Sequence, residues 1–290
     1  MIRRITSSSS PPKPLPPGNF PSLLTGLSVL EFSRVIAAPV ARRCLAAHGV
    51  DVLWVTSPNL PSLPGLDIDM SRGKRSIQLD LDSAEGKDAL RRLLRDADVL
   101  IQSYRPGSLA AKGLSTEEVL AICPDGIVVA SLYAWGEAGS WKDARGFDSM
   151  AQTASGLNTD KADAFAVVDE GQDDAYPPAK VLPVQALDHA SGYFLATGIL
   201  AALWRRAREG GSWEVGVSLA GTGIFLRGLG SEDVRFQAEG VHNMASTFLE
   251  GSETELGTLK AARHAAEVEG KVVGYEYMPR GLGSASAEWL

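Results

Sequence analysis

Asp188 has the position in the sequence that most suggests chemistry. It precedes residues 190–208, which combine a broad apolar face with a basic end and stop at Gly210, a pattern that predicts a buried helix. A carboxylate at a helix N-terminus lies among unpaired N–H groups and at the positive end of the helix dipole. Both favour its ionised form and can hold a developing oxyanion. Aspartate is also a common helix cap, so a purely structural role is the alternative.

Three cations form the second candidate group. Lys74, Arg75 and Arg105 each lie beside a predicted strand or turn, where loops gather at an edge of a sheet. Ammonium and guanidinium groups in such loops can bind phosphate. The alternative is ordinary surface charge exposed to solvent. His189 is not added to the candidates, because adjacent helical residues point about 100° apart and would not share a proton with Asp188.

The elements that must position these residues alternate between extended and helical patterns. Strands are predicted at residues 27–33, 52–55, 76–81, 98–102, 126–132 and 213–217. Helices are predicted at residues 37–48, 83–97, 115–123 and 190–208, and from residue 218 onward. Residues 160–178 lack periodicity and are interpreted as a surface excursion or linker. The repeated strand–helix–strand order predicts an α/β fold with an open, mainly parallel, Rossmann-like sheet and flanking helices.

Composition excludes several classes of protein. With 44% apolar and 22% charged residues the chain is typical of a globular protein, and no apolar run is long enough to span a membrane. The net charge of −7 argues against a nucleic-acid partner. Cys44 and Cys123 lie 79 positions apart, and neither is expected to have a second cysteine or histidine nearby at metal-ligand spacing, so neither a disulfide framework nor a metal site is predicted. Two isolated cysteines favour a reducing compartment.

The first 20 residues are rich in proline and serine and form the first predicted region, a disordered tail. Residues 1–17 in particular contain too little apolar surface to offset the entropy lost on ordering. Arg3 and Arg4 make the tail basic, and it contains no acidic residue, so a mitochondrial address is an alternative to the predicted cytoplasmic location.

Four sequence blocks occur in the order found in one known family. They are GLSVLEFSRVIAAPVARRCLAAHGVDVLWV, RGKRSIQLDLDSAEGKDALRRLLRDADVLIQSYRPGSLAAKGLS, RGFDSMAQTASG and LDHASGYFLATGILAALWRRAREGG. Over about residues 26–230 the chain resembles the family III CoA-transferases, which include formyl-CoA transferase and 2-methylacyl-CoA racemase.

The resemblance implies acyl transfer, with coenzyme A as a substrate, an organic acid as its partner and no metal. Asp188 would attack the thioester carbonyl of an acyl-CoA and form a mixed anhydride, releasing the CoA thiolate. The loop of Val35, Ile36 and Ala37 would pack against the thioester. Lys74 and Arg75 belong to one family signature, and Tyr104 and Arg105 to another; all four are expected to contact CoA. A homodimer is also implied, because members of the family interlock.

Two positions depart from particular branches of the family. Ile36 replaces a polar residue of formyl-CoA transferase, which makes oxalate-type substrates doubtful. Phe147 stands where the racemase branch has a histidine, and phenylalanine cannot transfer a proton. Racemisation by two bases is therefore disfavoured.

The resemblance assigns residues 21–230 to the large domain and residues 231–290 to a C-terminal extension. The small domain of the family is expected to be reduced or absent. Two alternatives to an acyl-CoA transferase stay open: an isomerase or lyase that reuses the cleft without CoA, and a non-catalytic partner subunit.

Overall fold

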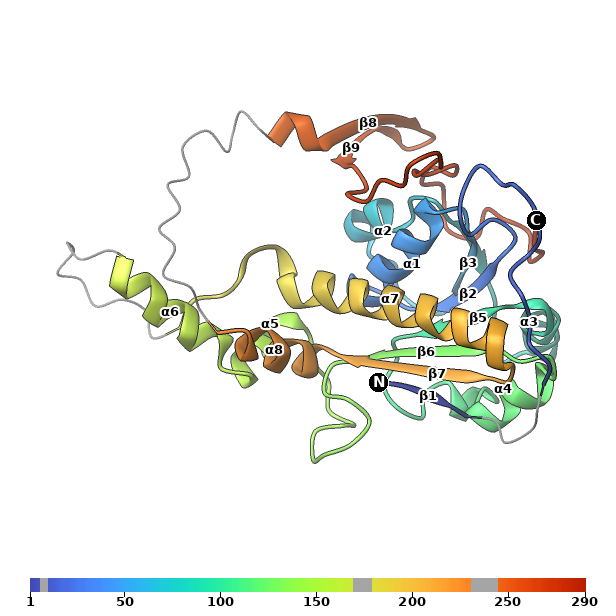
Figure 1. The fold of residues 1–290 in the computed structure, drawn as a ribbon, viewed down its shortest axis with the longest axis horizontal. Coiled ribbons are helices and arrows are strands. Elements are labelled where there is room, and N and C mark those ends of the chain that lie inside the picture. Colours follow the sequence, from blue (N-terminus) through green and yellow to red (C-terminus); the bar gives the residue numbers. More distant parts are fainter. Residues whose placement is uncertain (6–9, 169–178, 231–244) are drawn as a thin grey trace.

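Residues 1–5, 10–168, 179–230 and 245–290 are described by the computed structural model (Figure 1). A seven-stranded sheet of order β1-β7-β6-β5-β2-β3-β4 forms its centre. Its strands are β1 (Ile2–Arg4), β2 (Ser28–Phe32), β3 (Asp51–Thr56), β4 (Arg75–Gln78), β5 (Val99–Gln102), β6 (Val128–Tyr133) and β7 (Trp213–Ser218). Neighbouring strands from β7 to β4 are parallel, and only β1 is antiparallel to its neighbour. The predicted α/β class and mainly parallel sheet are confirmed.

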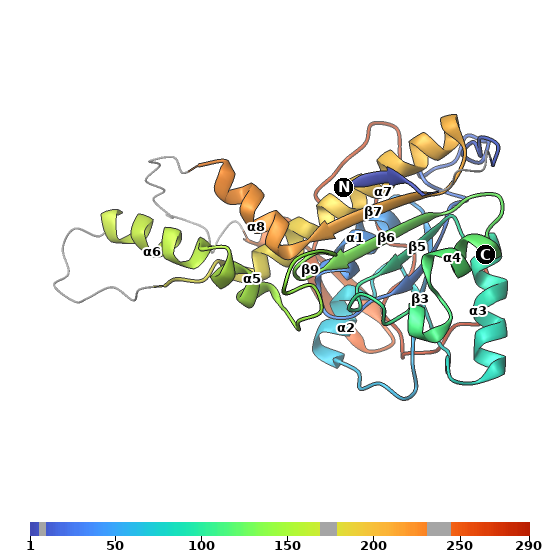
Figure 2. The same cartoon turned by 90° about the horizontal axis from the view of Figure 1, so that it is seen from below.

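Helices cover both faces of this sheet. They are α1 (Ala37–Ala47), α2 (Pro64–Met70), α3 (Ala84–Asp96), α4 (Thr116–Ile122), α5 (Asp148–Ala154), α6 (Leu157–Val168), α7 (Ala186–Glu209) and α8 (Leu219–Gly228). Short 3-10 turns are η1 (Ala110–Lys112), η2 (Pro183–Gln185) and η3 (Ala245–Phe248). Figure 2 shows α3 and α4 across the sheet from α7 and α1. None of the described helices is both long and apolar enough to cross a membrane.

The two-layer packing follows from the alternation of side chains along each strand. Val29 of β2 faces the core formed with α1 and α7, whereas the next residue, Leu30, faces the core formed with α3 and α4. Val99 and Leu100 of β5 divide in the same way. Because successive strand residues point to opposite faces, continuous apolar runs give a sheet buried on both sides.

Two predicted regions differ from the structure. Ile2–Arg4 forms β1 at the edge of the sheet, paired with β7, so the prediction of a free tail is wrong at these residues. A three-residue segment gains its order from the exposed β7 edge, which local composition does not reveal. Residues 160–178 are predicted to form a surface excursion or linker without regular structure, but residues 160–168 belong to helix α6. Residues 169–178 lie outside the described part.

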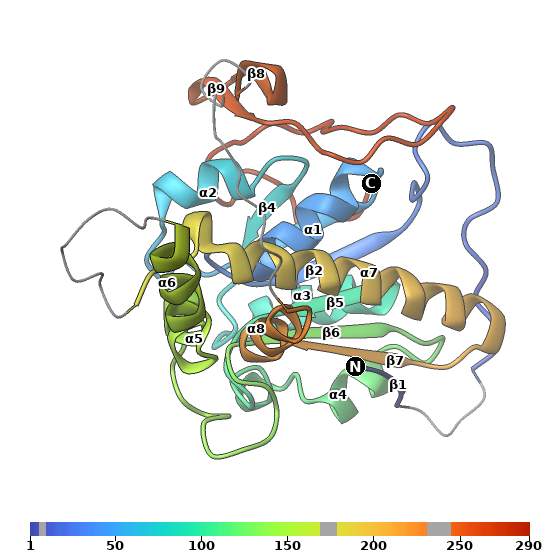
Figure 3. The same cartoon turned by 60° about the vertical axis from the view of Figure 1, so that its left-hand side comes forward.

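The C-terminal segment adds a small separate sheet. Strands β8 (Leu249–Thr254) and β9 (Gly257–Ala262) form an antiparallel hairpin, which Figure 3 shows beyond α1 and α2, on the side remote from β7. The remainder returns along the main sheet, where the backbone N–H of Gly283 donates to Ser76 Oγ and that of Leu290 to Asp51 Oδ2.

Helix α7 is the longest helix and packs along α1. Their approach is closest at Gly192, where a Cβ atom would lie 2.6 Å from the Ala37 carbonyl oxygen and 2.7 Å from Val40 Cβ. Only a residue without a side chain fits there, because neither the carbonyl nor a β-branched core residue can move freely.

We therefore expect Gly192→Ala to lower the free energy of unfolding by roughly 1–3 kcal/mol through overpacking. Gly228→Ala is the matched control, because a Cβ there meets no atom within 4 Å and alanine favours a helix. Urea unfolding measures both variants. A Gly192→Ala protein as stable as the Gly228→Ala protein would contradict this account.

Candidate active site at the switch point of the sheet

The strand order places a switch point between β2 and β5. From β2 the chain continues to β3 and β4 on one side, whereas β5, β6 and β7 lie on the other. Loops that leave two such neighbouring strands diverge, so ligands of open α/β sheets bind at the carboxyl ends of these strands. A cleft of about 390 Å³ lies there. It is lined by Arg34, Val35, Ile36, Ala37, Ser103, Tyr104, Arg105, Ser108, Leu132, Ala134, Arg145, Gly146, Phe147, Asp188 and Leu219.

Six of the eight residues predicted from the sequence meet in this cleft. Val35, Ile36 and Ala37 follow β2, Tyr104 and Arg105 follow β5, and Asp188 comes from α7. These six residues span more than 150 positions of the chain, and the sheet topology brings them together.

Lys74 and Arg75 do not reach the cleft. Arg75 is the first residue of β4 and forms a two-pronged ion pair with Asp51, the first residue of β3, so it lies at the opposite end of the strands. Lys74 is 5% exposed, and its Nζ has no hydrogen-bond partner in the described part of the chain. Burial and the nearby Arg42 and Arg43 lower its pKa well below the usual range. Their expected contact with CoA phosphates does not fit these positions.

The loops that carry the site contain strained backbone. Val35, Val184 and Gln185 are the three non-glycine residues with positive φ in the described chain, at 71°, 53° and 55°. Val35 leads into α1, and the other two lead into α7. Such conformations cost of order 1–3 kcal/mol each and persist only where the surrounding structure fixes them. Helices α1 and α7, two of the helices that border the cleft, are thus entered through strained loops.

Asp188 occupies the third residue of α7 and not its cap. The cap residue is Gln185, which makes no side-chain capping bond, and the helix begins four residues before the predicted start at residue 190. Asp188 is 7% exposed, so its carboxyl group lies at the base of the cleft with little contact to solvent.

Asp148 is the functional neighbour that we did not identify from the sequence. It is fully buried in the first turn of α5, and its Oδ2 accepts a 2.8 Å hydrogen bond from the Asp188 backbone N–H. Gln152 donates to the other oxygen of Asp148 and accepts a bond from the Leu182 backbone N–H at 2.8 Å. The RGFD block contains Asp148, but no sequence pattern reveals that α5 meets the first turn of α7.

The protonation of Asp188 depends on its burial and on the neighbouring Asp148. Burial, followed by the charge of Asp148, raises the pKa of Asp188 to about 7. The expected preference for the ionised form at the helix N-terminus is therefore outweighed by burial and by Asp148. The helix dipole acts on a partly buried group by up to about 2 kcal/mol, which is less than the combined opposition of burial and a neighbouring carboxylate.

Three arginines supply positive charge around the cleft. Arg34 is half-buried, whereas Arg105 and Arg145 are exposed, and none of them forms an ion pair with a carboxylate in the described residues. A second cleft of about 380 Å³ adjoins the first and shares Arg34 and Tyr104 with it. Together the two clefts can hold an elongated anionic ligand.

The fold and this cleft define an α/β protein with a cleft at the switch point of a parallel sheet, the place where open α/β sheets bind their ligands. The profile of CoA-transferase family III matches residues 24–232, and the chain belongs to this family.

The names of two similar curated proteins state a CoA-transferase activity. Acetyl-coenzyme A transferase nodX of Hypoxylon pulicicidum is 32% identical over 212 residues, which cover 72% of this chain and 34% of nodX. Formyl-CoA:oxalate CoA-transferase of Bradyrhizobium diazoefficiens is 30% identical over 240 residues, covering 79% of this chain and 53% of that protein. The chain thus spans between about a third and about half of the length of these relatives.

Solved structures show the same fold. Rv3272 of Mycobacterium tuberculosis, in an orthorhombic crystal form, has a TM-score of 0.61 and 28% identity, covering 73% of this chain and 59% of that one. A CaiB/BaiF family protein from Brucella suis has a TM-score of 0.62 and 26% identity, with 82% and 65% covered.

The raised pKa of Asp188 predicts a pH-dependent gain of stability in Asp188→Asn. A carboxyl that titrates near 7 in the fold and near 4 in the unfolded chain destabilises the fold increasingly as pH rises through that range. At pH 8 we expect Asp188→Asn to unfold with a higher free energy than the parent, by up to roughly 4 kcal/mol. Below about pH 4 the gain should vanish.

Asp88→Asn provides the matched control, because Asp88 is exposed on α3, where it pairs with the neighbouring Arg91. It should change stability by less than about 0.5 kcal/mol at either pH. Chemical denaturation at pH 4 and pH 8 measures all three proteins. A loss of stability at pH 8 in Asp188→Asn would show that Asp188 is ionised and stabilised in the fold.

Proposed function

We propose that this chain provides the large domain of an acyl-CoA transferase, with Asp188 as the nucleophile. The observation that supports this most strongly is the meeting of Asp188, the loop of Val35 to Ala37 and the Tyr104–Arg105 turn in one cleft at the switch point. The names of the relatives, an acetyl-CoA transferase and a formyl-CoA:oxalate CoA-transferase, agree with it.

The reaction begins with an acyl-CoA in the cleft. An oxygen of ionised Asp188 attacks the thioester carbonyl carbon, the carbon–sulfur bond breaks, and CoA leaves as the thiolate. The product is a mixed anhydride between Asp188 and the acyl group. Attack of the thiolate on the Asp188 carbonyl then releases the first acid and leaves an aspartyl thioester. An incoming carboxylate repeats these steps in reverse order, and the CoA leaves on the new acid.

The environment of Asp188 suits this role. A carboxylate that is removed from water needs less desolvation when it attacks, and a pKa of about 7 leaves a large fraction ionised at neutral pH. Asp148 holds the Asp188 backbone N–H at 2.8 Å and thereby fixes the first turn of α7. Asp148 is therefore a positioning residue that also sets the charge of the nucleophile.

The arginines of the cleft would bind the anionic parts of the substrates. Arg34 lies between the two clefts, so the CoA phosphates would extend from the thioester toward the second cleft. Arg105 and Arg145 line the first cleft, where the carboxylate of the exchanging acid must approach. Ile36 in the same wall favours an acyl group with apolar surface over oxalate.

If Asp188 is the nucleophile, Asp188→Asn should lower kcat/KM for CoA exchange by more than about 10³-fold, because an amide does not attack a thioester. In the parent, kcat/KM should rise with pH and level off above about 7, as Asp188 ionises. Radiolabel exchange between an acyl-CoA and free acids measures the rates. Asp88→Asn is the control and should retain parental activity.

Trapping identifies the intermediate directly. The protein is incubated with acyl-CoA and then with hydroxylamine, and mass spectrometry is expected to find a hydroxamate at Asp188. Exchange without modification, or full exchange by Asp188→Asn, would exclude the anhydride and favour another reaction in the cleft. CoA binding without any turnover would favour a non-catalytic partner subunit.

A homodimer is the second part of the proposal. An exposed apolar face continues from α7, through Tyr193, Leu200 and Trp204, to Ile224 and Phe225 of α8. The three α7 residues are spaced seven and four apart, so they share one side of the helix. The rings of Phe194 and Phe225 meet edge to face at 5.3 Å and join the two helices into one surface.

We expect the parent to be dimeric at micromolar concentration and Trp204→Lys to be monomeric, because a charge in the centre of an apolar interface is costly to bury. Val272→Lys is the control, since Val272 is equally exposed but lies away from α7 and α8. Light scattering after size-exclusion chromatography gives the mass. A monomeric parent, or a Trp204→Lys dimer, would contradict this surface assignment.

A cytoplasmic location stays a prediction. It rests on the two free cysteines, Cys44 and Cys123, which suit a reducing compartment. Fluorescence microscopy of the tagged full chain tests it, and mitochondrial signal would favour the basic tail as an address.

A further inference from the structure

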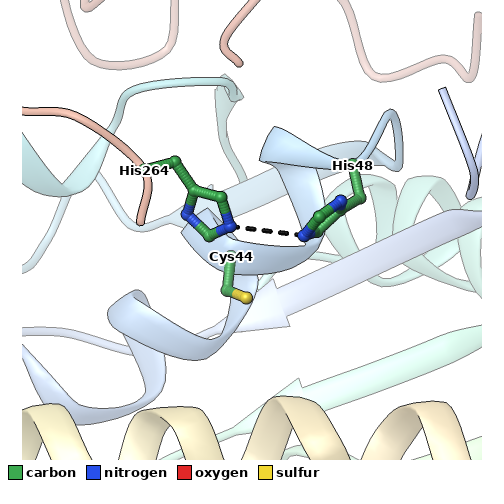
Figure 4. A group of neighbouring side chains, drawn as sticks. All are labelled: Cys44, His48 and His264. Atoms are coloured by element: carbon green, nitrogen blue, oxygen red, sulfur yellow. Dashed lines mark hydrogen bonds between the residues drawn. The ribbon is translucent and has the colours of Figure 1, made fainter. Parts of the chain in front are cut away.

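Three side chains with metal-ligating atoms converge at the far end of α1 from the cleft. Cys44 lies in the last turns of α1, His48 is its C-terminal cap residue, and His264 follows β9 (Figure 4). One ligand atom from each lies within 4.8 Å of the others. The Nε2 atoms of the two imidazoles face each other at 3.2 Å. All three residues are partly buried.

The spacing of the two imidazole nitrogens suits a tetrahedral ion. Two nitrogens that bind one zinc at 2.0–2.1 Å with a tetrahedral angle lie about 3.3 Å apart, close to the distance between these imidazoles. Cys44 and His48 are four residues apart, so they share one face of α1. The expectation that no histidine lies near Cys44 at metal-ligand spacing is wrong, because His48 follows four residues later; the third ligand, His264, is 216 residues away from His48.

The ligand types narrow the choice of metal. One thiolate and two imidazoles suit zinc, whereas magnesium and calcium require oxygen ligands. With three protein ligands the fourth position of a tetrahedral zinc remains for water. Binding replaces the thiol proton of Cys44 by a sulfur–zinc bond and releases that proton.

The surrounding chain fixes the segment that carries His264 but leaves the ring of His48 only partly constrained. The C-terminal segment is tied to the end of α1 by the Gly274 N–H, which donates to the Ala47 carbonyl oxygen at 2.9 Å. His48 Nδ1 is buried and has no hydrogen-bond partner in the described part of the chain. The ring of His48 is therefore oriented only by packing and by its contact with His264, and a bound ion would add the missing constraint.

We propose that Cys44, His48 and His264 bind one Zn²⁺ ion that clamps the C-terminal segment to α1. The 11 residues of α1 span about 16 Å, so the ion lies a helix length from Ala37 and the cleft. Its role is structural, since no group of the cleft reaches it. The clamp joins the segment after β9 to the helix that borders the cleft.

Zinc binding is tested on the full chain after dialysis against a chelator. Competition with a fluorescent zinc indicator is expected to show one ion per chain, and the melting temperature should rise on adding zinc, because the ion binds only the folded site. Cys44→Ser and His264→Asn should each weaken binding by at least about 100-fold. Cys123→Ser and His189→Asn are the controls, which remove the same side-chain types outside the cluster and should bind like the parent.

If a variant folds poorly, two further measurements still test whether zinc binds at this cluster. Cobalt-loaded parent protein should show a thiolate-to-cobalt charge-transfer band, which requires Cys44 as a ligand. Zinc should slow proteolysis around residues 257–277 in the parent and have no such effect in His264→Asn. Less than one zinc per chain, no charge-transfer band, or equal zinc affinity in Cys44→Ser would overturn the proposal, whatever the outcome of the acyl-transfer assays.

Discussion

Helix α7 passes over the first turn of α1 at Gly192, where a Cβ would lie 2.6 Å from the Ala37 carbonyl oxygen. Gly192 is one helical turn after Asp188, so this contact sets how deeply the carboxyl group enters the cleft. The same contact holds the loop of Val35 to Ala37 against the base of the cleft. Helix–helix packing at one small residue thus determines the relative positions of Asp188 and the loop of Val35 to Ala37.

Buried carboxyl groups lie at both ends of α7, and their surroundings shift their pKa values in opposite directions. At its C-terminal end Arg206 pairs with Asp98 at 2.7 Å, and Asp98 also accepts a bond from the Ser28 N–H. Burial alone would raise the pKa of Asp98, but Arg206 and Lys13 outweigh it and keep the pKa below its usual range. At the N-terminal end Asp188 faces another carboxylate. The ion pair of Arg206 and Asp98 thus anchors one end of α7, and the other end carries the Asp188 carboxyl group, whose pKa is raised.

Much of this arrangement could be predicted from local patterns, because apolar runs define strands that are buried on both faces. The strands at Leu30 and Leu100 and the capped helix after Ser115 illustrate this. The predictions that were wrong concern features set by contacts between segments far apart in the sequence. The raised pKa of Asp188 comes from its burial and from Asp148, 40 residues away, and β1 is ordered by its pairing with β7. Lys74 and Arg75 precede the strand predicted at residues 76–81, so the order of the sequence already places them at the amino end of that strand, whereas the cleft lies at the carboxyl ends.

The C-terminal segment reaches both the metal-ligand cluster at one end of α1 and the second cleft near the other end. Through His264 it contacts the far end of the helix, and through Leu282 it lines the second cleft, beside Arg34 and Tyr104. A ligand that fills both clefts would therefore touch the segment that the zinc ion holds. Because Leu282 lies only 18 residues after His264, ordering at the cluster restricts the wall of the second cleft. The proposed metal site and the proposed CoA site are then coupled through one stretch of chain, although no ligand atom is shared between them.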